Sequence, residues 1–125
     1  MRPRILIVED EPIVALNYAS ILQEAGYESV GPVGSIKKGL DLIASQDLDG
    51  AVLDIDISGL PVDPIIMALR RKRVPFIFVS ANPDQVGPHN EAVFLPKPCT
   101  AIQLISAIRQ LVQKQARTDL QECKD

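Results

Sequence analysis

Five polar residues stand at the ends of apolar runs, where their side chains could act together. Glu9 and Asp10 follow the first run, Asp54 a second, Ser80 a third and Lys97 a fourth. If these runs end side by side, carboxylates converge, and a like-charged pair at about 4 Å costs about 4 kcal/mol at an effective dielectric near 20. A divalent cation relieves this repulsion, and oxygen ligands favour Mg²⁺. The pattern therefore predicts a magnesium site beside a serine and a lysine.

The run that ends at Asp54 is the one around which the chain is organised. Residues 51–53 are all apolar, one glycine precedes them and another follows soon after, which is typical of a buried parallel strand. In open α/β sheets, ligands bind at the carboxyl ends of the strands. We therefore expect Asp54 to lie at a binding edge, with Asp56 two residues further along.

Five strands are predicted to alternate with helices. The expected strands are residues 5–8, 28–33, 51–53, 76–79 and 93–95. Pro32 favours an edge position for the second strand, because proline cannot donate a ladder hydrogen bond. This alternation predicts an α/β domain with a parallel sheet and right-handed crossovers, in the flavodoxin-like strand order 2-1-3-4-5.

Capping signals define the expected helices. Pro12 suits the first turn of the first helix, and Gly26 ends it. Ser35 is expected to cap the second helix, Asp63 and Pro64 to open the third as cap and first residue, and Thr100 with Gln103 to form a capping box for the last. The stretch 58–61 is predicted to be a loop. Residues 82–90 are polar and broken by Pro and Gly, so the fourth of five possible helices is expected to be short or absent.

In its order of motifs the sequence resembles the receiver domain of two-component response regulators, over roughly residues 4 to 112. The resemblance rests on an acidic pair after the first strand, Asp54 after the third, Ser80 after the fourth and Lys97-Pro98 after the fifth. It implies a receiver domain at residues 1–117 and a polar tail at 118–125. From about Gln113 onward the chain is polar, so it is expected to fray there.

The resemblance implies a role for each acidic residue. Asp54 would be the phosphoacceptor, a carboxylate nucleophile that forms an aspartyl phosphate. Asp10 and Asp54 would bind Mg²⁺ directly, Glu9 would bind it through water or lie nearby, and the backbone carbonyl of Asp56 would be the third protein ligand. The side chain of Asp56 adds a further carboxylate beside the nucleophile.

The resemblance also implies roles for residues of the last two strands. Lys97 would stabilise charge on the transferring phosphoryl group. Ser80 and the N–H group of Ala81 would bind phosphoryl oxygens. Phe94 matches an aromatic switch position, and phosphorylation is expected to order or shift the segment 82–92.

The expected function is that of a stand-alone receiver, a signalling domain and not a turnover enzyme. Its expected partners are a sensor histidine kinase or histidine phosphotransfer protein and a downstream protein target. A net charge of −3 argues against nucleic acid. The apolar run after the N-terminus is too short for a membrane span or signal peptide, so a cytoplasmic protein is expected. The sequence indicates no particular oligomeric state.

Three alternatives remain open at this point. Asp54-x-Asp56 followed by Ser80 and Lys97 is also similar to haloacid dehalogenase phosphatases, although there the motif normally opens the domain and a later acidic pair follows. A toprim-like site of Glu9 with Asp54 and Asp56 leaves Ser80 and Lys97 without a role. An interaction module with a decayed site is the third. Each of the candidate site residues, taken alone, could also have a purely structural role as a helix cap, a turn residue or a core residue.

Overall fold

The computed structural model describes residues 2–81 and 93–123, without the side chains of Asp56 and residues 114–123. The strands of its main sheet are β1 (Arg4–Val8), β2 (Glu28–Val33), β3 (Gly50–Leu53), β6 (Phe76–Ser80) and β7 (Val93–Pro96). They are all parallel, in the order β2-β1-β3-β6-β7. The predicted fold class and strand order 2-1-3-4-5 are therefore confirmed, with β2 at an edge.

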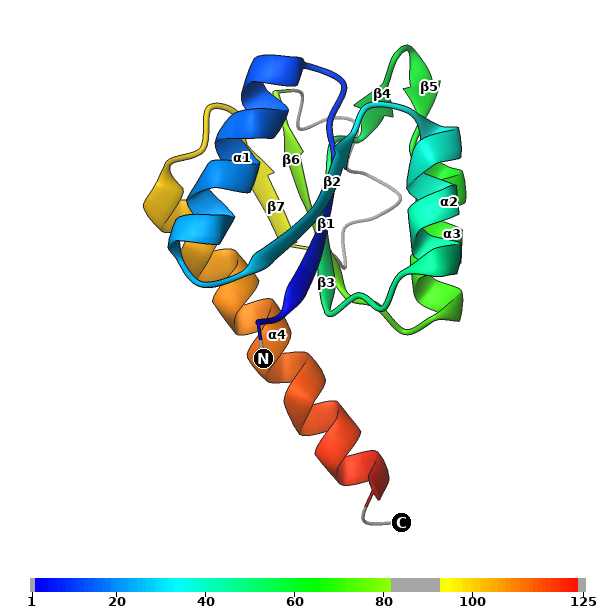
Figure 1. Ribbon diagram of the computed structural model, residues 1–125, viewed down its shortest axis with the longest axis vertical. Coiled ribbons are helices and arrows are strands. Elements are labelled where there is room, and N and C mark those ends of the chain that lie inside the picture. Colours follow the sequence, from blue (N-terminus) through cyan, green and yellow to red (C-terminus); the bar gives the residue numbers. More distant parts are fainter. Residues whose placement is uncertain (1, 82–92, 124–125) are drawn as a thin grey trace.

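Helices cover both faces of this sheet (Figure 1). They are α1 (Pro12–Glu24), α2 (Ile36–Ser45), α3 (Asp63–Arg71) and α4 (Ala101–Cys123). Strand alternation divides the core: Ile5 and Ile7 of β1 pack with residues of α1 and α4, whereas Leu6 and Val8 pack with residues of α2 and α3. Both faces of the sheet are buried, which explains the uniformly apolar strands.

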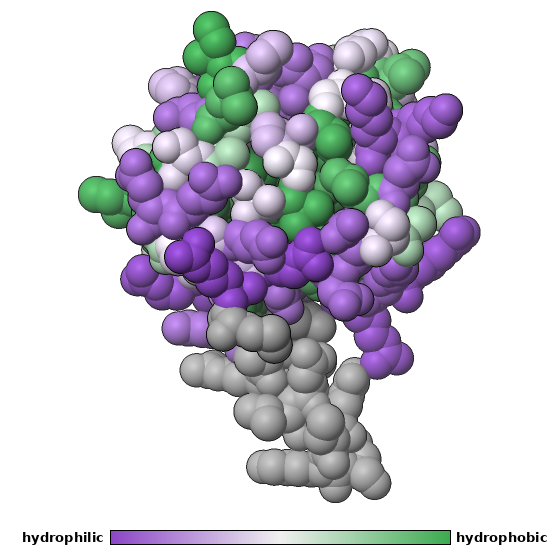
Figure 2. All heavy atoms as spheres, viewed as in Figure 1, coloured by the Kyte–Doolittle hydropathy of each residue, from purple (hydrophilic) through white to green (hydrophobic). Residues whose placement is uncertain are grey.

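Polar side chains cover much of the molecular face shown in Figure 2, with hydrophobic ones between them. Within the described residues, no helix combines the length and apolarity needed to span a bilayer. The predicted reduction of the fourth helix falls on residues 82–92, which lie outside the described residues.

The predicted start and stop signals mostly hold. The Ser35 hydroxyl accepts a hydrogen bond from the Lys38 N–H group at 3.2 Å. Thr100 and Gln103 form the reciprocal capping box, with bonds of 2.9 and 3.1 Å. Helix α1 starts at Pro12 and ends before Gly26, whose φ of +94° lies in the left-handed region.

Three local expectations were wrong. The N-cap of α3 is Val62 and not Asp63, because the buried Val62 side chain fixes the entry of the chain and its carbonyl accepts the first helical bonds. Residues 58–61 are not a simple loop, because they close a short antiparallel hairpin, β4 (Asp56–Ile57) with β5 (Leu60–Pro61). Helix α4 does not end near Gln113 but continues to Cys123 and extends beyond the sheet (Figure 1). The added segment contains neither Pro nor Gly, and polarity alone does not stop a helix.

Candidate functional site

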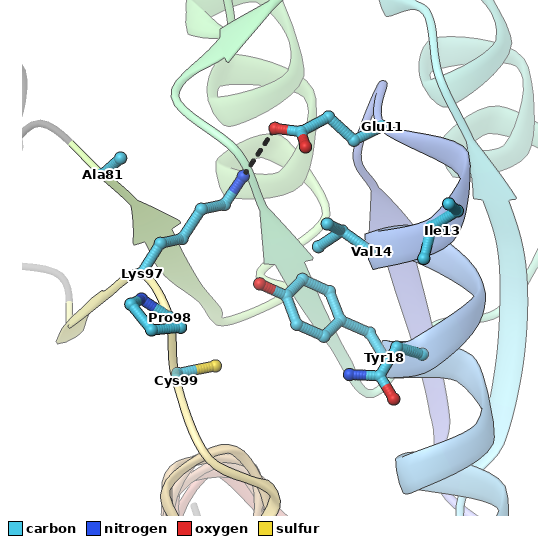
Figure 3. Close-up of a pocket in the computed structure, with 9 residues that line it drawn as sticks. Glu11, Ile13, Val14, Tyr18, Ala81, Lys97, Pro98 and Cys99 are labelled. Atoms are coloured by element: carbon cyan, nitrogen blue, oxygen red, sulfur yellow. Dashed lines mark ion pairs between the residues drawn. The ribbon is translucent and has the colours of Figure 1, made fainter.

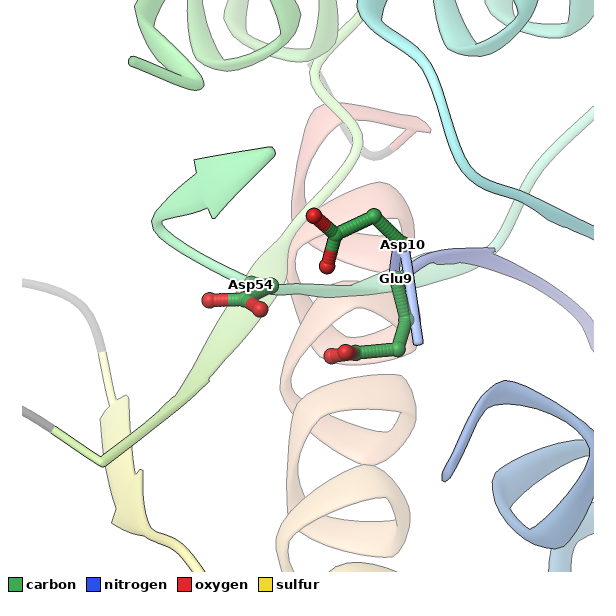
Figure 4. Close-up of side chains that lie close together, drawn as sticks. All are labelled: Glu9, Asp10 and Asp54. Atoms are coloured by element: carbon green, nitrogen blue, oxygen red, sulfur yellow. The ribbon is translucent and has the colours of Figure 1, made fainter. Parts of the chain in front are cut away.

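The acidic residues meet at the carboxyl ends of two neighbouring strands. β1 and β3 pair in register at Val8 and Leu53, so Glu9, Asp10 and Asp54 leave the sheet side by side. The Asp54 N–H group donates to the Val8 carbonyl at 3.0 Å, which extends the ladder to Asp54 itself. One carboxylate oxygen from each of the three residues lies within 4.8 Å of the others (Figure 4). This is a set of hard oxygen donors of the kind that binds a divalent cation.

Lys97 reaches this cluster from the end of β7, the edge strand opposite β2. Its Nζ lies 3.0 and 3.2 Å from the two carboxylate oxygens of Glu9 and 3.2 Å from Oδ2 of Asp54. A longer contact of 3.7 Å joins it to Glu11 (Figure 3). The backbone N–H group of Lys97 donates to the Ser80 carbonyl at 2.9 Å, which fixes the base of this side chain at the end of β6. One ammonium group therefore connects the ends of β1, β3 and β7.

Glu9 is the most deeply buried carboxylate of the group, with only 3% of the residue exposed. Burial raises its pKa to about 7, the hydrogen bond from Lys97 offsets part of this rise, and the charge of Asp54 adds to it. For Lys97, burial acts to lower the pKa, but its bond to Glu9 and the charges of Asp54 and Glu9 outweigh it, so the pKa is raised. Lys97 is thus a permanent cation, whereas Glu9 titrates near neutral pH.

The metal-free protein is expected to lose stability as the pH rises from about 4.5 to about 7. Over this range the folded protein keeps a proton on Glu9 that the unfolded chain has released, so deprotonation favours unfolding. The stability that this bound proton contributes is fully present below pH 4.5 and is on the order of 1–3 kcal/mol. Urea unfolding at pH 5 and pH 7.5 measures it, with Glu24→Gln on the exposed face of α1 as the control. An unchanged pH dependence in Glu9→Gln would contradict this assignment.

The other predicted residues lie along the same edge of the sheet. Ser80 is buried at the end of β6, and Ala81 follows it at the surface. Phe94 of β7 pairs in register with Phe78 and packs, half-buried, against the core on the α2 and α3 side. Asp56 begins the β4–β5 hairpin, where its backbone pairs with Pro61. The roles predicted for these four residues stay predictions.

A pocket of about 520 Å³ opens beside Lys97, between α1 and the segment that joins β7 to α4. Pro98, Cys99, Val14 and Tyr18 form much of its wall (Figure 3). Tyr18 is a buried residue of α1, and its hydroxyl faces Cys99, a contact that the sequence does not indicate. Burial, and then the neighbouring charges of Cys99 and Glu9, raise the pKa of Tyr18. This hydroxyl therefore stays protonated.

A second contact that sequence reasoning missed reaches Asp10. The backbone N–H group of Ser58, at the turn of the β4–β5 hairpin, donates to Oδ2 of Asp10 at 2.8 Å. The Ser58-Gly59 pair between two short β-forming stretches was the available signal, because such pairs favour a tight hairpin turn.

Comparison with known proteins identifies the family. The family model described as response regulator receiver domain matches residues 5–109. The chain belongs to this family of receiver domains. Among curated relatives, the transcriptional regulatory protein PdtaR of Mycobacterium tuberculosis is 27% identical over 117 residues, which cover 89% of this chain and 57% of PdtaR. The phyllosphere-induced regulator PhyR of Methylorubrum extorquens is 29% identical over 127 residues, which cover 94% of this chain and 47% of PhyR. The receiver thus spans about half the length of these relatives.

Solved structures give the same result. SdrG from Sphingomonas melonis is 28% identical, with a TM-score of 0.78 over 89% of this receiver and 97% of SdrG. A response regulator receiver protein from Sinorhizobium medicae is 26% identical, with a TM-score of 0.83 over 91% of this chain and 97% of that one. These matches support a receiver domain, and they give no support to the haloacid dehalogenase alternative.

Proposed function

We propose that this receiver accepts a phosphoryl group from a phosphohistidine on a partner protein, with Asp54 as the acceptor. An Asp54 carboxylate oxygen forms a bond to phosphorus, the bond between phosphorus and the donor imidazole nitrogen breaks, and that nitrogen recovers a proton. The observation that carries the proposal is the position of Lys97, whose Nζ lies 3.2 Å from the Asp54 carboxylate and 3.0 Å from Glu9. The ammonium group is therefore next to the place where phosphoryl charge collects during transfer.

The proposed cation is Mg²⁺, because the three carboxylates offer only oxygen ligands within 4.8 Å of one another. Asp10 and Asp54 would bind it directly, the Asp56 carbonyl would complete the protein ligands, and Glu9 would lie nearby. When bound, Mg²⁺ neutralises charge on the transferring group. Ser80 and the Ala81 N–H group are the proposed hydrogen-bond donors to the phosphoryl oxygens. Incubation with acetyl phosphate and Mg²⁺, followed by peptide mapping, tests this function directly.

The partner surface that we propose surrounds the pocket beside Lys97. Ile13 on α1 is 85% exposed, Leu16 is 64% exposed, and Ile102 at the start of α4 is 81% exposed. Of these three, Ile13 lines the pocket itself, and an exposed large apolar side chain beside a reactive group is typical of a docking surface. A phosphohistidine partner must bring its imidazole to Asp54, and a partner held on α1 and the start of α4 would approach from the Lys97 side.

Replacing Ile13 by Asp is expected to slow phosphotransfer from a protein donor at least about tenfold, since one anchor residue of an interface is commonly worth 1–2 kcal/mol or more. Labelling by acetyl phosphate should stay unchanged, because this small donor needs no docking surface. The matched control is Met67→Asp on α3, which changes an equally apolar, 56% exposed side chain on the other face of the sheet. Equal losses in both variants, or a parallel loss with acetyl phosphate, would argue against this surface.

A further inference from the structure

The β4–β5 hairpin is an unusually tight connection between the phosphoacceptor strand and α3. Its two central residues, Ser58 and Gly59, have φ values of +53° and +79°. Positive φ at both central positions is the signature of the type I′ turn, which matches the natural twist of a two-residue hairpin. The strands on either side pair Asp56 with Pro61 and Ile57 with Leu60. The turn geometry is therefore fixed by the backbone itself.

The base of the hairpin is fixed in the core. Ile55, Ile57 and Val62 are buried, with at most 7% exposed, and all three belong to the hydrophobic cluster on the α2 and α3 side. The Val62 N–H group donates to the Ile55 carbonyl at 3.1 Å, which continues the hairpin ladder to its base. The hairpin therefore begins two residues after Asp54 and stands on a base that is packed in the core.

The turn lies against the end of β1. The Ser58 N–H group donates to Oδ2 of Asp10 at 2.8 Å, a contact between residues 48 positions apart in the sequence. A hydrogen bond from a backbone N–H group to a carboxylate is charge-assisted and fixes the orientation of the carboxylate plane. With one oxygen of Asp10 held by the turn, the carboxylate is restricted in the direction in which it can offer its other oxygen.

We propose that the β4–β5 hairpin is a positioning element for the metal site, in which the Ser58 N–H group orients the Asp10 carboxylate toward the cation. This inference rests on the proposed function, because it assumes that Asp10 and Asp54 share a divalent cation. The hairpin links the two proposed ligands, because it follows Asp54 in the chain and also orients Asp10. Groups that hydrogen-bond to metal ligands commonly change metal affinity 10- to 100-fold when they are altered.

The test separates the effect of the turn geometry on Mg²⁺ binding from the general effect of a substitution. Gly59→Val places a β-branched residue at φ +79°, a conformation that such residues avoid, while its Cβ meets no heavy atom within 4 Å, so the change acts through the backbone. Gly26→Val is the matched control, because Gly26 also has a positive φ, +94°, and its Cβ also meets no heavy atom within 4 Å, but it follows α1 at the opposite edge of the sheet from Asp10. Calorimetric titration with Mg²⁺ gives the affinity, and the amide proton shift of Ser58 reports the bond to Asp10.

We expect Gly59→Val to weaken Mg²⁺ binding 10- to 100-fold and to shift the Ser58 amide resonance, whereas Gly26→Val binds Mg²⁺ within about twofold of the wild type. Gly59→Ala, which imposes a milder version of the same strain, replaces Gly59→Val if thermal unfolding shows that the valine variant does not fold. Wild-type Mg²⁺ affinity in a variant whose Ser58 amide has shifted would overturn the positioning role alone. Absence of Mg²⁺ binding by the wild-type protein would overturn the metal site and this inference with it.

Discussion

Asp54→Ala is expected to take up no phosphoryl group from acetyl phosphate and Mg²⁺, whereas the wild-type protein gains one. Asp54 is the carboxylate that continues β3, and its side chain lies 3.2 Å from the Lys97 ammonium. Removal of the carboxylate removes the nucleophile, so the loss should be complete and not partial. Intact-mass measurement followed by peptide mapping gives both the stoichiometry and the site.

Two further variants make this result specific. Asp56→Ala should still be labelled, because the proposed contribution of Asp56 is its backbone carbonyl, which the substitution keeps. Asp41→Ala, an exposed position on α2, controls for the loss of any carboxylate. Labelling that persists in Asp54→Ala, or that maps to Asp56, would overturn the assignment of Asp54 and reopen the phosphatase-like use of both residues.

Asp10→Asn is expected to weaken Mg²⁺ binding by at least about tenfold and to stabilise the metal-free protein slightly. The weaker binding follows from the loss of one charged ligand. The stabilisation follows because Asp10 shares the edge of the sheet with Glu9 and Asp54, and close like charges destabilise the folded state. Because this edge is partly open to water, the gain should be on the order of 1 kcal/mol or less.

Glu11→Gln is the matched control for Asp10→Asn. It removes one negative charge from the same edge, but Glu11 lies outside the acidic cluster. Its carboxylate makes only a long contact of 3.7 Å with Lys97. Titration of Mg²⁺ against thermal unfolding measures both effects in one experiment. If the two variants weaken binding equally, Asp10 acts through its charge alone and is not a ligand.

The main architecture could be predicted because several signals agree along the chain. Uniformly apolar runs defined the strands, and polar residues at their ends defined the edge that carries the site. In a parallel sheet all such ends meet at one edge, so Glu9, Asp54 and Lys97 could be placed together without coordinates. The capping signals at Ser35 and Thr100 act over three residues and were equally readable.

The contacts that could not be predicted depend on tertiary geometry. The bond from Ser58 to Asp10 spans 48 residues and requires both the hairpin turn and its fixed base. Val62 displaces Asp63 as the cap of α3 because core burial sets the path of the backbone at this point. Tyr18 occupies a buried position of α1, where a phenylalanine would give the same spacing of apolar residues. The spacing therefore could not predict the contact between its hydroxyl and Cys99.

The strand order has a consequence for the balance of charge at the edge of the sheet. β2, β1 and β3 are neighbours, so the first 53 residues contain three adjacent strands, and β6 and β7 are then added outward on one side. Glu9, Asp10 and Asp54 all lie within the first 54 residues, but Lys97 follows Asp54 by 43 residues. In the folded sheet, the ammonium group that contacts Glu9 and Asp54 therefore comes from the end of β7, the strand furthest along the chain. A fragment that ended before β7 would bring the same carboxylates together without this cation, so the ends of β1 and β3 would repel each other more strongly than in the whole domain.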